Sequence, residues 1–334
     1  MAWYNYDKIN SYNAMLNIIM TNRGFGKSYG SKKMVIKNFI KKGEQWIYVR
    51  RYKTELKKRA LFFDDIKHKF PNHELTVQGN TMLCDGKVMG FFLALSVSQQ
   101  EKSTSYPNVT SIIFDEFIID KSHIRYLTNE VEVALDLYET VNRTRTGKEK
   151  TRMYFLGNNI SIVNPYFIFF DCIPKKGERF TVAKNGQIVI EMFADSEFIE
   201  NKKKSEFGQL VEGTKYADYS IENNSLRDSE AFILPNKPKD CKFKFSVIYN
   251  GIKLGFWVTY KEGFIYVSDK IEENRLCFVL QKDDHTPNLL MRDKLNEFFA
   301  FKEVIKYFRL GIVRFRNQKV KVTFYEILQF MNIK

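Results

Sequence analysis

Residues 15–28 read MLNIIMTNRGFGKS, in which a short apolar run leads into a loop with two glycines, a lysine and a serine. Apolar residues then recur at approximately helical spacing over residues 29–42, and Gly43 provides a stop signal. The pattern predicts a strand, a glycine loop and a helix in that order. Such a loop can hold phosphate groups, because glycines let the backbone approach closely and the helix N-terminus carries partial positive charge.

The loop offers the groups that a nucleoside triphosphate with Mg²⁺ requires. Lys27 would place its ammonium group on the β and γ phosphates, and the Ser28 hydroxyl would ligate the magnesium ion. Thr21 stands where the usual GxxxxGK[ST] pattern has its first glycine, so a glycine-rich turn without a ligand stays open for this motif alone. The candidate nucleotide-binding residues are Thr21, Asn22, Arg23, Gly24, Phe25, Gly26, Lys27 and Ser28.

Residues 111–116, SIIFDE, form a second motif: an apolar strand that ends in paired acids. In P-loop enzymes this is the Walker B position, where Asp115 would hold Mg²⁺ and Glu116 would polarise the attacking water. A core strand that ends in two solvated acids is the alternative for this motif alone. The two motifs in this order predict ATP binding and hydrolysis. We favour adenine because the chain has no Asn-Lys-x-Asp guanine reader.

Further candidates lie near the ends of other predicted elements. Asn158 follows the apolar segment 153–157 and fits the polar sensor of catalytic-glutamate ATPases, or an ordinary turn residue. Arg143 and Arg145 lie in a basic loop before that segment. In a ring, this edge can face the next subunit's nucleotide, where an arginine supplied in trans stabilises the transferring phosphoryl group. A solvated basic loop is the alternative.

The chain is strongly basic, with a formal net charge of +14 from 53 Lys and Arg against 39 Asp and Glu. This balance points to a polyanionic partner, either nucleic acid or an anionic membrane surface. Arg50, Arg51 and Lys53 follow a predicted strand and could face the phosphates, a neighbouring subunit or DNA. The sequence leaves these three partners open.

The order of predicted elements indicates an α/β fold for the first part of the chain, with a central, mostly parallel sheet and the ligand at the strand C-termini. Further strands are predicted at residues 45–51, within 74–96, at 111–115 and at 153–156, with a helix at 129–141. Residues 195–227 have few apolar runs and are interpreted as a linker. An antiparallel meander and helices follow, at 243–250, 254–260, 264–268, 294–308 and 323–331. We expect a P-loop ATPase domain at 1–197, a linker domain at 198–228 and an α+β domain at 229–334.

The four cysteines lie far apart, form no CxxC pair and do not cluster with the four histidines. We therefore expect reduced, packed thiols, with a zinc site or a disulfide framework as the alternative. The chain shows no signal-peptide pattern and no run of about 18 apolar residues, so we expect a soluble protein that acts inside a cell and is not a membrane protein.

Five segments occur in the same order as in the DNA-packaging ATPases of small podoviruses: TNRGFGKS, QWIYVRRYK, LSVSQQEKSTSYPNVTSIIFDEF, ETVNRTR and NPYFIFF. The likeness continues through YNGIKLGFWV, so the chain resembles that family of P-loop ring translocases of the additional-strand, catalytic-glutamate type. The resemblance implies a five-subunit ring that docks on the portal of a procapsid and pumps double-stranded DNA inward by ATP hydrolysis. It also implies the host cytoplasm as the location, a monomeric state in solution, and a structural packaging RNA as a further candidate partner.

The resemblance assigns roles by position. Lys27 and Ser28 match the family's Walker A motif, Asp115 and Glu116 its Walker B motif, Arg143 its trans-acting arginine finger, and Lys102 a lysine that reaches toward the neighbouring active site. Arg50, Lys53 and Arg145 are further candidates for coupling or for action in trans. Lys102, His123 and Arg125 are candidates for a DNA-gripping loop.

The C-terminal domain is expected, from the resemblance, to be RNase H-like and to have lost nuclease activity. Two-metal nucleases need several convergent carboxylates, whereas residues 242–250 contain no acid and Asp269, Asp283 and Asp284 fall outside strand centres. We therefore predict no nuclease activity. Its basic residues suit phosphate contacts to duplex DNA or structural RNA, or else form a solvated face: Lys242, Lys244, Lys253, Arg309, Arg314, Arg316 and Lys319.

Two other functional classes stay in view. One is a headful-type terminase with a working nuclease, which the missing carboxylates disfavour. The other is a nucleotide-switched DNA-binding or scaffold protein without turnover, which Glu116 disfavours.

Overall fold

The chain divides into two units, Met1–Ser225 and Leu226–Lys334, which are described separately. The computed structural model describes residues 4–101, 103–119, 126–127, 129–143, 145, 150–158, 164–170, 172, 174, 178–193, 195–214, 232–273, 275–287, 289–331 and 333. Of the expected linker domain, the helices α5 (Ser196–Lys203) and α6 (Glu206–Leu210) fall within the first unit. A separate linker domain at 198–228 stays a prediction.

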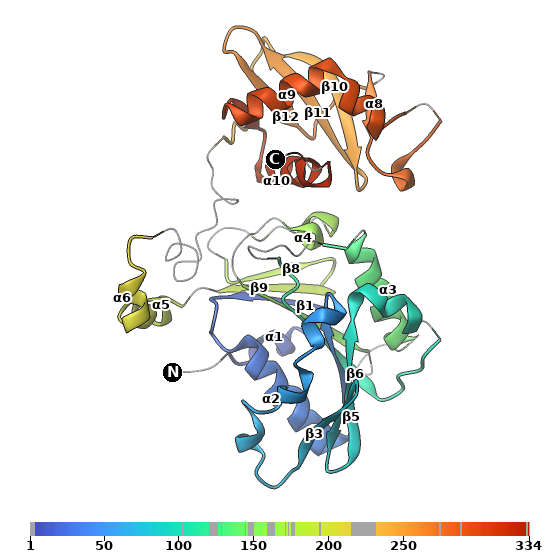
Figure 1. Cartoon of the computed structure of the whole chain (residues 1–334), viewed down its shortest axis with the longest axis vertical. Helices are drawn as coiled ribbons and strands as arrows, with labels where there is room; N and C mark the ends of the chain where they lie inside the picture. Colours follow the sequence, from blue (N-terminus) through green and yellow to red (C-terminus); the bar gives the residue numbers. More distant parts are fainter. Residues whose placement is uncertain are drawn as a thin grey trace. The chain divides into compact units, whose positions relative to one another are not determined.

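The first unit is built on one large mixed sheet (Figure 1). Its strands are β1 (Leu16–Thr21), β2 (Gln45–Arg50), β3 (Leu75–Gln78), β4 (Thr81–Cys84), β5 (Lys87–Ala94), β6 (Val109–Asp115), β7 (Arg152–Asn158), β8 (Phe180–Ala183) and β9 (Ile188–Phe193). They lie in the order β3-β4-β5-β2-β6-β7-β1-β9-β8. Neighbouring strands from β5 to β9 are parallel, and antiparallel strands complete both edges. The predicted α/β fold with a mostly parallel sheet is confirmed.

Helices cover both faces of this sheet, which is why its central strands are apolar on both sides. The helices are α1 (Asp7–Ser11), α2 (Lys27–Lys42), α3 (Glu130–Asn142) and α4 (Pro165–Phe169), with 3-10 turns η1 (Lys53–Leu56), η2 (Arg59–Leu61), η3 (Lys67–Lys69) and η4 (Leu95–Glu101). In β1, Ile18 and Met20 pack in the core with α3 and α4, whereas Ile19 packs in the core with α2. Among the described residues, no helix is long and apolar enough to cross a membrane.

Strand β7 lies between β1 and β6. The register pairs Thr21 of β1 with Asn158 of β7, and Asp115 of β6 with Leu156 of β7. β7 is thus an additional strand between β1, which leads into the glycine loop, and β6, which ends in Asp115. The resemblance to additional-strand ATPases implies this arrangement. Because these parallel strands end at the same edge, their terminal polar residues come together there.

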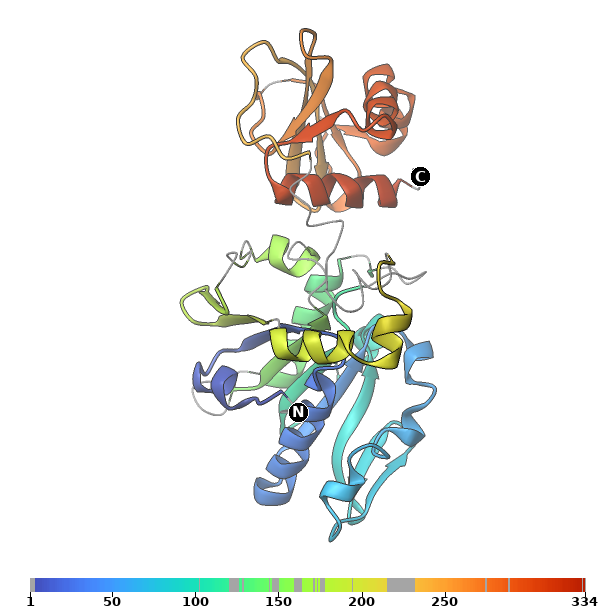
Figure 2. The ribbon, with the colours of Figure 1, turned by 90° about the vertical axis from the view of Figure 1, so that its left-hand side faces the viewer.

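The second unit contains a six-stranded sheet in the order β14-β13-β10-β11-β12-β15. Its elements are β10 (Lys242–Tyr249), β11 (Ile252–Thr259), β12 (Phe264–Ser268), β13 (Cys277–Val279), η6 (Lys282–Asp284), β14 (Leu290–Met291), α8 (Arg292–Glu297), α9 (Phe299–Arg309), β15 (Val313–Phe315) and α10 (Gln318–Phe330). β10, β11 and β12 form the predicted antiparallel meander, and β13 joins β10 in parallel. α10 packs against the sheet (Figure 2) and buries Phe324 and Ile327 in the core.

The prediction of a single helix at 294–308 is wrong in one respect, because Phe298 separates α8 from α9. Phe298 has an extended backbone (φ −71°, ψ 119°), and its ring centroid lies 5.3 Å from that of Phe245 and 5.1 Å from that of Phe278. Tertiary packing of one aromatic ring therefore interrupts a helical sequence pattern.

All four cysteines are free thiols, and Cys84 and Cys172 are buried, as expected. Although histidines and cysteines do not cluster in the sequence, the fold brings one of each together. Pairing of β3 with β4 brings His73 close to Cys84 and Asp85, and His73 Nδ1 lies 2.7 Å from an Asp85 carboxylate oxygen. The Asp85 carboxylate also accepts a hydrogen bond from the Glu74 N–H at 2.8 Å, so these contacts close the hairpin.

Candidate nucleotide-binding site

The glycine loop connects β1 directly to α2. Gly24 has φ +88° and Gly26, the residue that caps α2, has φ +83°. Both values lie in the left-handed region, which glycine adopts without a steric penalty. The loop therefore brings the chain to the N-terminal end of α2, where unpaired N–H groups and the helix dipole favour a bound anion.

Lys27 is the first residue of α2, and only 7% of it is exposed. Its Nζ donates to Thr21 Oγ1 at 3.0 Å, to the Asn22 carbonyl oxygen at 3.1 Å and to Asn158 Oδ1 at 3.2 Å. Burial lowers the pKa of Lys27 to about 8, although the nearby carboxylates of Asp115 and Glu116 act to raise it. The threonine that replaces the usual glycine thus supplies an oxygen acceptor to the lysine.

The two acids of the SIIFDE motif occupy different environments. Asp115 ends β6, is 8% exposed and accepts a hydrogen bond from the Tyr48 hydroxyl at 2.7 Å. Burial, followed by the charge of Asp115, raises the pKa of Tyr48, so this hydroxyl remains a donor. Glu116 follows with a left-handed backbone (φ +57°), and its side chain is 61% exposed. One acid is thus fixed at the strand end while the other reaches into solvent.

Arg50 contacts acids of its own chain. Its Nη2 lies 2.6 Å from Glu116 Oε2 and 2.8 Å from Glu55 Oε1, and its Nη1 lies 4.0 Å from Asp115 Oδ2. Arg50 therefore lies beside the two acids of the SIIFDE motif, and which of the three partners it serves stays a prediction. Lys53, at the start of η1, is exposed.

Arg51, the next residue, lies on the opposite side of the chain and is 2% exposed. Its guanidinium forms a double hydrogen bond with Glu130, at 2.6 and 2.9 Å, and also donates to the carbonyl oxygens of Glu116 and Phe117. The same three partners were left open for Arg51 as for Arg50, and no sequence pattern indicated Glu130. The alternation of side chains along a strand is the signal that separates the two arginines.

The two arginines after α3 differ in how they are held. Arg143 is exposed, has φ +34° and donates to the Thr104 carbonyl oxygen at 2.9 Å. The guanidinium of Arg145 donates to carbonyl oxygens of Val109 at 2.6 Å and of Tyr106 at 3.1 Å, within its own chain. Lys102, His123 and Arg125 lie outside the described residues.

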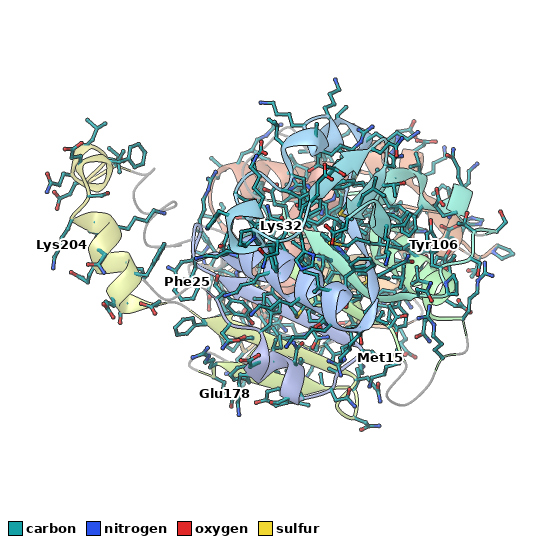
Figure 3. All side chains as sticks on the ribbon, turned by 90° about the horizontal axis from the view of Figure 1, so that it is seen from below. Met15, Phe25, Lys32, Tyr106, Glu178 and Lys204 are labelled. Atoms are coloured by element: carbon teal, nitrogen blue, oxygen red, sulfur yellow. The ribbon has the colours of Figure 1, made fainter. Side chains whose placement is uncertain are left out.

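Helix α5 contacts the outer side of the glycine loop. The N–H of Asp195 donates to Asn22 Oδ1 at 2.9 Å, and the rings of Phe25 and Phe198 meet edge to face at 5.4 Å. Figure 3 shows Phe25 on the side of the first unit from which α5 and α6 extend, with Lys204 between these two helices. Helix α5, which leads into the expected linker at 198–228, therefore begins in contact with the glycine loop.

In the second unit, the described acids do not converge on a metal site. Asp269 pairs with Arg316 at 2.5 Å, and Asp284 accepts a hydrogen bond from the Gly251 N–H at 2.9 Å. Within the part of the chain that the structure describes, the one group of three or more potential metal ligands is that of His73 in the first unit. Lys244 donates to the Tyr260 hydroxyl at 2.8 Å, which places a basic group beside an exposed aromatic ring.

Comparison with known proteins gives matches over almost the whole chain. The model of the family described as Podovirus DNA encapsidation protein (Gp16) matches residues 1–333. The chain is 40% identical over 333 residues to the DNA packaging protein of Bacillus phage phi29, which covers 99% of this chain and 98% of that relative.

Two solved structures are similar in fold and in sequence. One is the bacteriophage Phi-29 viral genome packaging motor assembly, with a TM-score of 0.76 and 38% identity over 99% of this chain and 100% of that chain. The other is the N-terminal domain of the DNA packaging ATPase from bacteriophage phi29, with a TM-score of 0.53 and 46% identity over 57% of this chain and 96% of that chain.

Proposed function

Because this chain belongs to the Podovirus DNA encapsidation protein family, we propose that it is the subunit of a ring motor that hydrolyses ATP to move double-stranded DNA into a viral procapsid. Its general activity is that of a DNA-packaging ATPase. The observation that carries the proposal is the convergence of Lys27, Asp115 and Asn158 at one edge of the sheet, with Glu116 beside them.

Lys27, Ser28 and Asp115 would hold the triphosphate and its Mg²⁺. The hydroxyl oxygen of Ser28 and the carboxylate oxygens of Asp115 are the hard ligands that Mg²⁺ prefers, and Asp115 is anchored by the Tyr48 hydroxyl. When bound, Mg²⁺ neutralises charge on the β and γ phosphates. Lys27 would exchange its bonds to Thr21 and Asn22 for phosphate oxygens, which are stronger, charged acceptors.

Glu116 would act as the base that polarises the attacking water. Its Oε2 is bound to Arg50 Nη2 at 2.6 Å, which orients the carboxylate, and a carboxylate has a second oxygen that can accept a hydrogen bond from water. Asn158, whose side-chain oxygen contacts Lys27, would sense the γ phosphate from the tip of β7.

Arg143 is the candidate for an arginine supplied to the next subunit's site. It is exposed at the C-terminal end of α3, where its guanidinium donates to the carbonyl oxygens of Thr140 and Thr104, whereas Arg145 is half-buried and donates to the carbonyl oxygen of Val109. An arginine placed on the transferring phosphoryl group stabilises the charge that develops there. This role requires a ring, for which the resemblance implies five subunits.

The proposed partners are double-stranded DNA, the viral portal and a structural packaging RNA. The net charge of +14 and the basic, aromatic surface of the second unit support contacts to a phosphate backbone. Action in the host cytoplasm, docked on the procapsid, follows from this proposal. The second unit would contribute binding without cleavage, because its described carboxylates do not converge.

The experiment is the steady-state ATPase rate with and without duplex DNA for the wild type, Lys27→Ala and Glu116→Gln. We expect DNA-stimulated turnover in the wild type, loss of nucleotide binding in Lys27→Ala, and retained binding with only a small residual turnover in Glu116→Gln. Normal turnover by Glu116→Gln would refute the assignment of the base.

A further inference from the structure

We propose that Arg51 is a positioning residue that holds the backbone of Glu116 in its active orientation; the inference rests on the proposed role of Glu116 as the catalytic base. Arg51 does not face the nucleotide. It lies behind the end of β6, where it is 2% exposed and contacts the main chain of the residues that follow Asp115.

The contacts of Arg51 bracket the peptide that follows Glu116. Its Nη1 donates to the Glu116 carbonyl oxygen at 3.2 Å, and its Nη2 donates to the Phe117 carbonyl oxygen at 2.6 Å. Two donors on one rigid planar group therefore fix two successive carbonyl directions. The Phe117 N–H also bonds to the Leu156 carbonyl oxygen at 3.3 Å, which ties this turn to β7.

The backbone of Glu116 needs such support. Its φ of +57° lies in the left-handed region, which a residue with a Cβ avoids unless its surroundings impose it. The direction of the Cα–Cβ bond, and hence the reach of the carboxylate, depends on this conformation. A relaxed backbone at Glu116 would move its carboxylate away from the edge where Lys27 and Asp115 lie.

Glu130 holds Arg51 in place. Its carboxylate accepts both Arg51 Nε and Nη2, and it also accepts the Tyr166 hydroxyl at 2.9 Å and the Leu127 N–H at 2.8 Å. Glu130 is itself 3% exposed at the start of α3. The guanidinium is thus located by a carboxylate that has its own fixed partners.

Stability alone does not account for this arrangement. A buried ion pair gains little net free energy, because desolvation of both charges offsets their attraction, and well-packed apolar residues often replace such pairs without loss. What an apolar replacement cannot do is donate to the two carbonyl oxygens around Glu116. The fork-shaped donor set of arginine matches that requirement.

Arg51→Lys separates positioning from charge pairing. A lysine can still pair with Glu130, but its single ammonium group cannot also reach both carbonyl oxygens. We expect kcat for DNA-stimulated hydrolysis to fall between about 10- and 100-fold, the size of effect that a misplacement of about 1 Å produces. KM for ATP and the affinity for a fluorescent nucleotide analogue stay within about twofold of the wild type, because the glycine loop is untouched.

Two further variants complete the test. Glu130→Asp keeps the negative charge, but its shorter side chain draws the Arg51 guanidinium back from the carbonyl oxygens. We expect the same fall in kcat without a change in nucleotide binding. This variant tests the proposal even if Arg51→Lys folds poorly. Arg59→Lys is the matched control, since Arg59 also donates to two carbonyl oxygens, of Gly79 and Leu56, on η2 away from the site, and it should keep wild-type turnover.

Introducing Arg51→Lys into Glu116→Gln decides whether Arg51 acts through Glu116. No further loss of the residual turnover supports the proposal. A further loss, an unchanged kcat in Arg51→Lys and Glu130→Asp, or a fall in kcat accompanied by weaker nucleotide binding would overturn it. If Glu116→Gln itself hydrolyses ATP normally, the proposed base is wrong, which is distinct from a failure of Arg51 alone.

Discussion

Lys27 should take up a proton when nucleotide binds, and the amount should depend on pH. Burial lowers its pKa from 10.5 to about 8 in the nucleotide-free protein. Near pH 7, 8 and 9, about one tenth, one half and nine tenths of these side chains are therefore neutral. A bound triphosphate restores the charged form, because the phosphate oxygens favour the ammonium group.

The expected proton uptake per bound nucleotide follows these fractions, so it rises from about 0.1 near pH 7 to about 0.9 near pH 9. By the same linkage, nucleotide affinity falls about tenfold over that range, since neutral lysine must first be protonated. Isothermal titration calorimetry with a non-hydrolysable ATP analogue, in buffers of different ionisation enthalpy, measures the uptake directly.

Two substitutions on α2 test the source of the proton. Lys27→Arg keeps a fixed charge, so uptake should disappear in the complexes that this variant still forms. Lys32→Arg is the matched control, because Lys32 is also buried but pairs with Asp65 at 2.6 Å, away from the loop. Uptake that stays flat between about pH 7 and 9 in the wild type, or that persists in Lys27→Arg, would refute the reasoning.

Other parts of the site give further predictions. Tyr48→Phe removes the hydroxyl that donates to Asp115 but keeps the ring packing, so thermal unfolding should show a loss of about 1.5–3 kcal/mol, the value of a hydrogen bond to a charged group. A loss below about 0.5 kcal/mol would mean that this bond is not formed in solution. The purified protein should not cleave duplex DNA with Mg²⁺ or Mn²⁺, and cleavage that is abolished by Asp269→Ala would contradict the lack of convergent carboxylates in the second unit.

The positions of the main site residues could be predicted because each stands at the end of an element with a clear sequence pattern. Apolar runs that end at Thr21 and Asp115 predicted buried parallel strands, and such strands bring their final residues to one edge. Asn158 was assigned by the same reasoning, and its contact with Lys27 agrees with the sensor position. The family resemblance, which the comparisons confirm, rests on these motifs.

The residues that support the site could not be predicted in the same way. The pair of Arg51 with Glu130 joins positions that lie far apart in the sequence, and each residue alone reads as an exposed charge. The break at Phe298 depends on aromatic packing with Phe245, which no local signal records. Sequence patterns identify groups that can perform chemistry, whereas tertiary contacts decide how those groups are held.

The central claim is an active site shared between subunits, and mixing two inactive variants tests it most directly. Arg143→Ala lacks the proposed finger and Glu116→Gln lacks the proposed base, so each alone should lose DNA-stimulated hydrolysis. In a mixed ring, an Arg143→Ala site beside a Glu116→Gln subunit regains every group, and part of the activity should return. Lys27→Ala mixed with Glu116→Gln is the control and should stay inactive, because every site then lacks a residue of its own subunit. Normal hydrolysis by Arg143→Ala alone, or no recovery in the first mixture, would contradict the account.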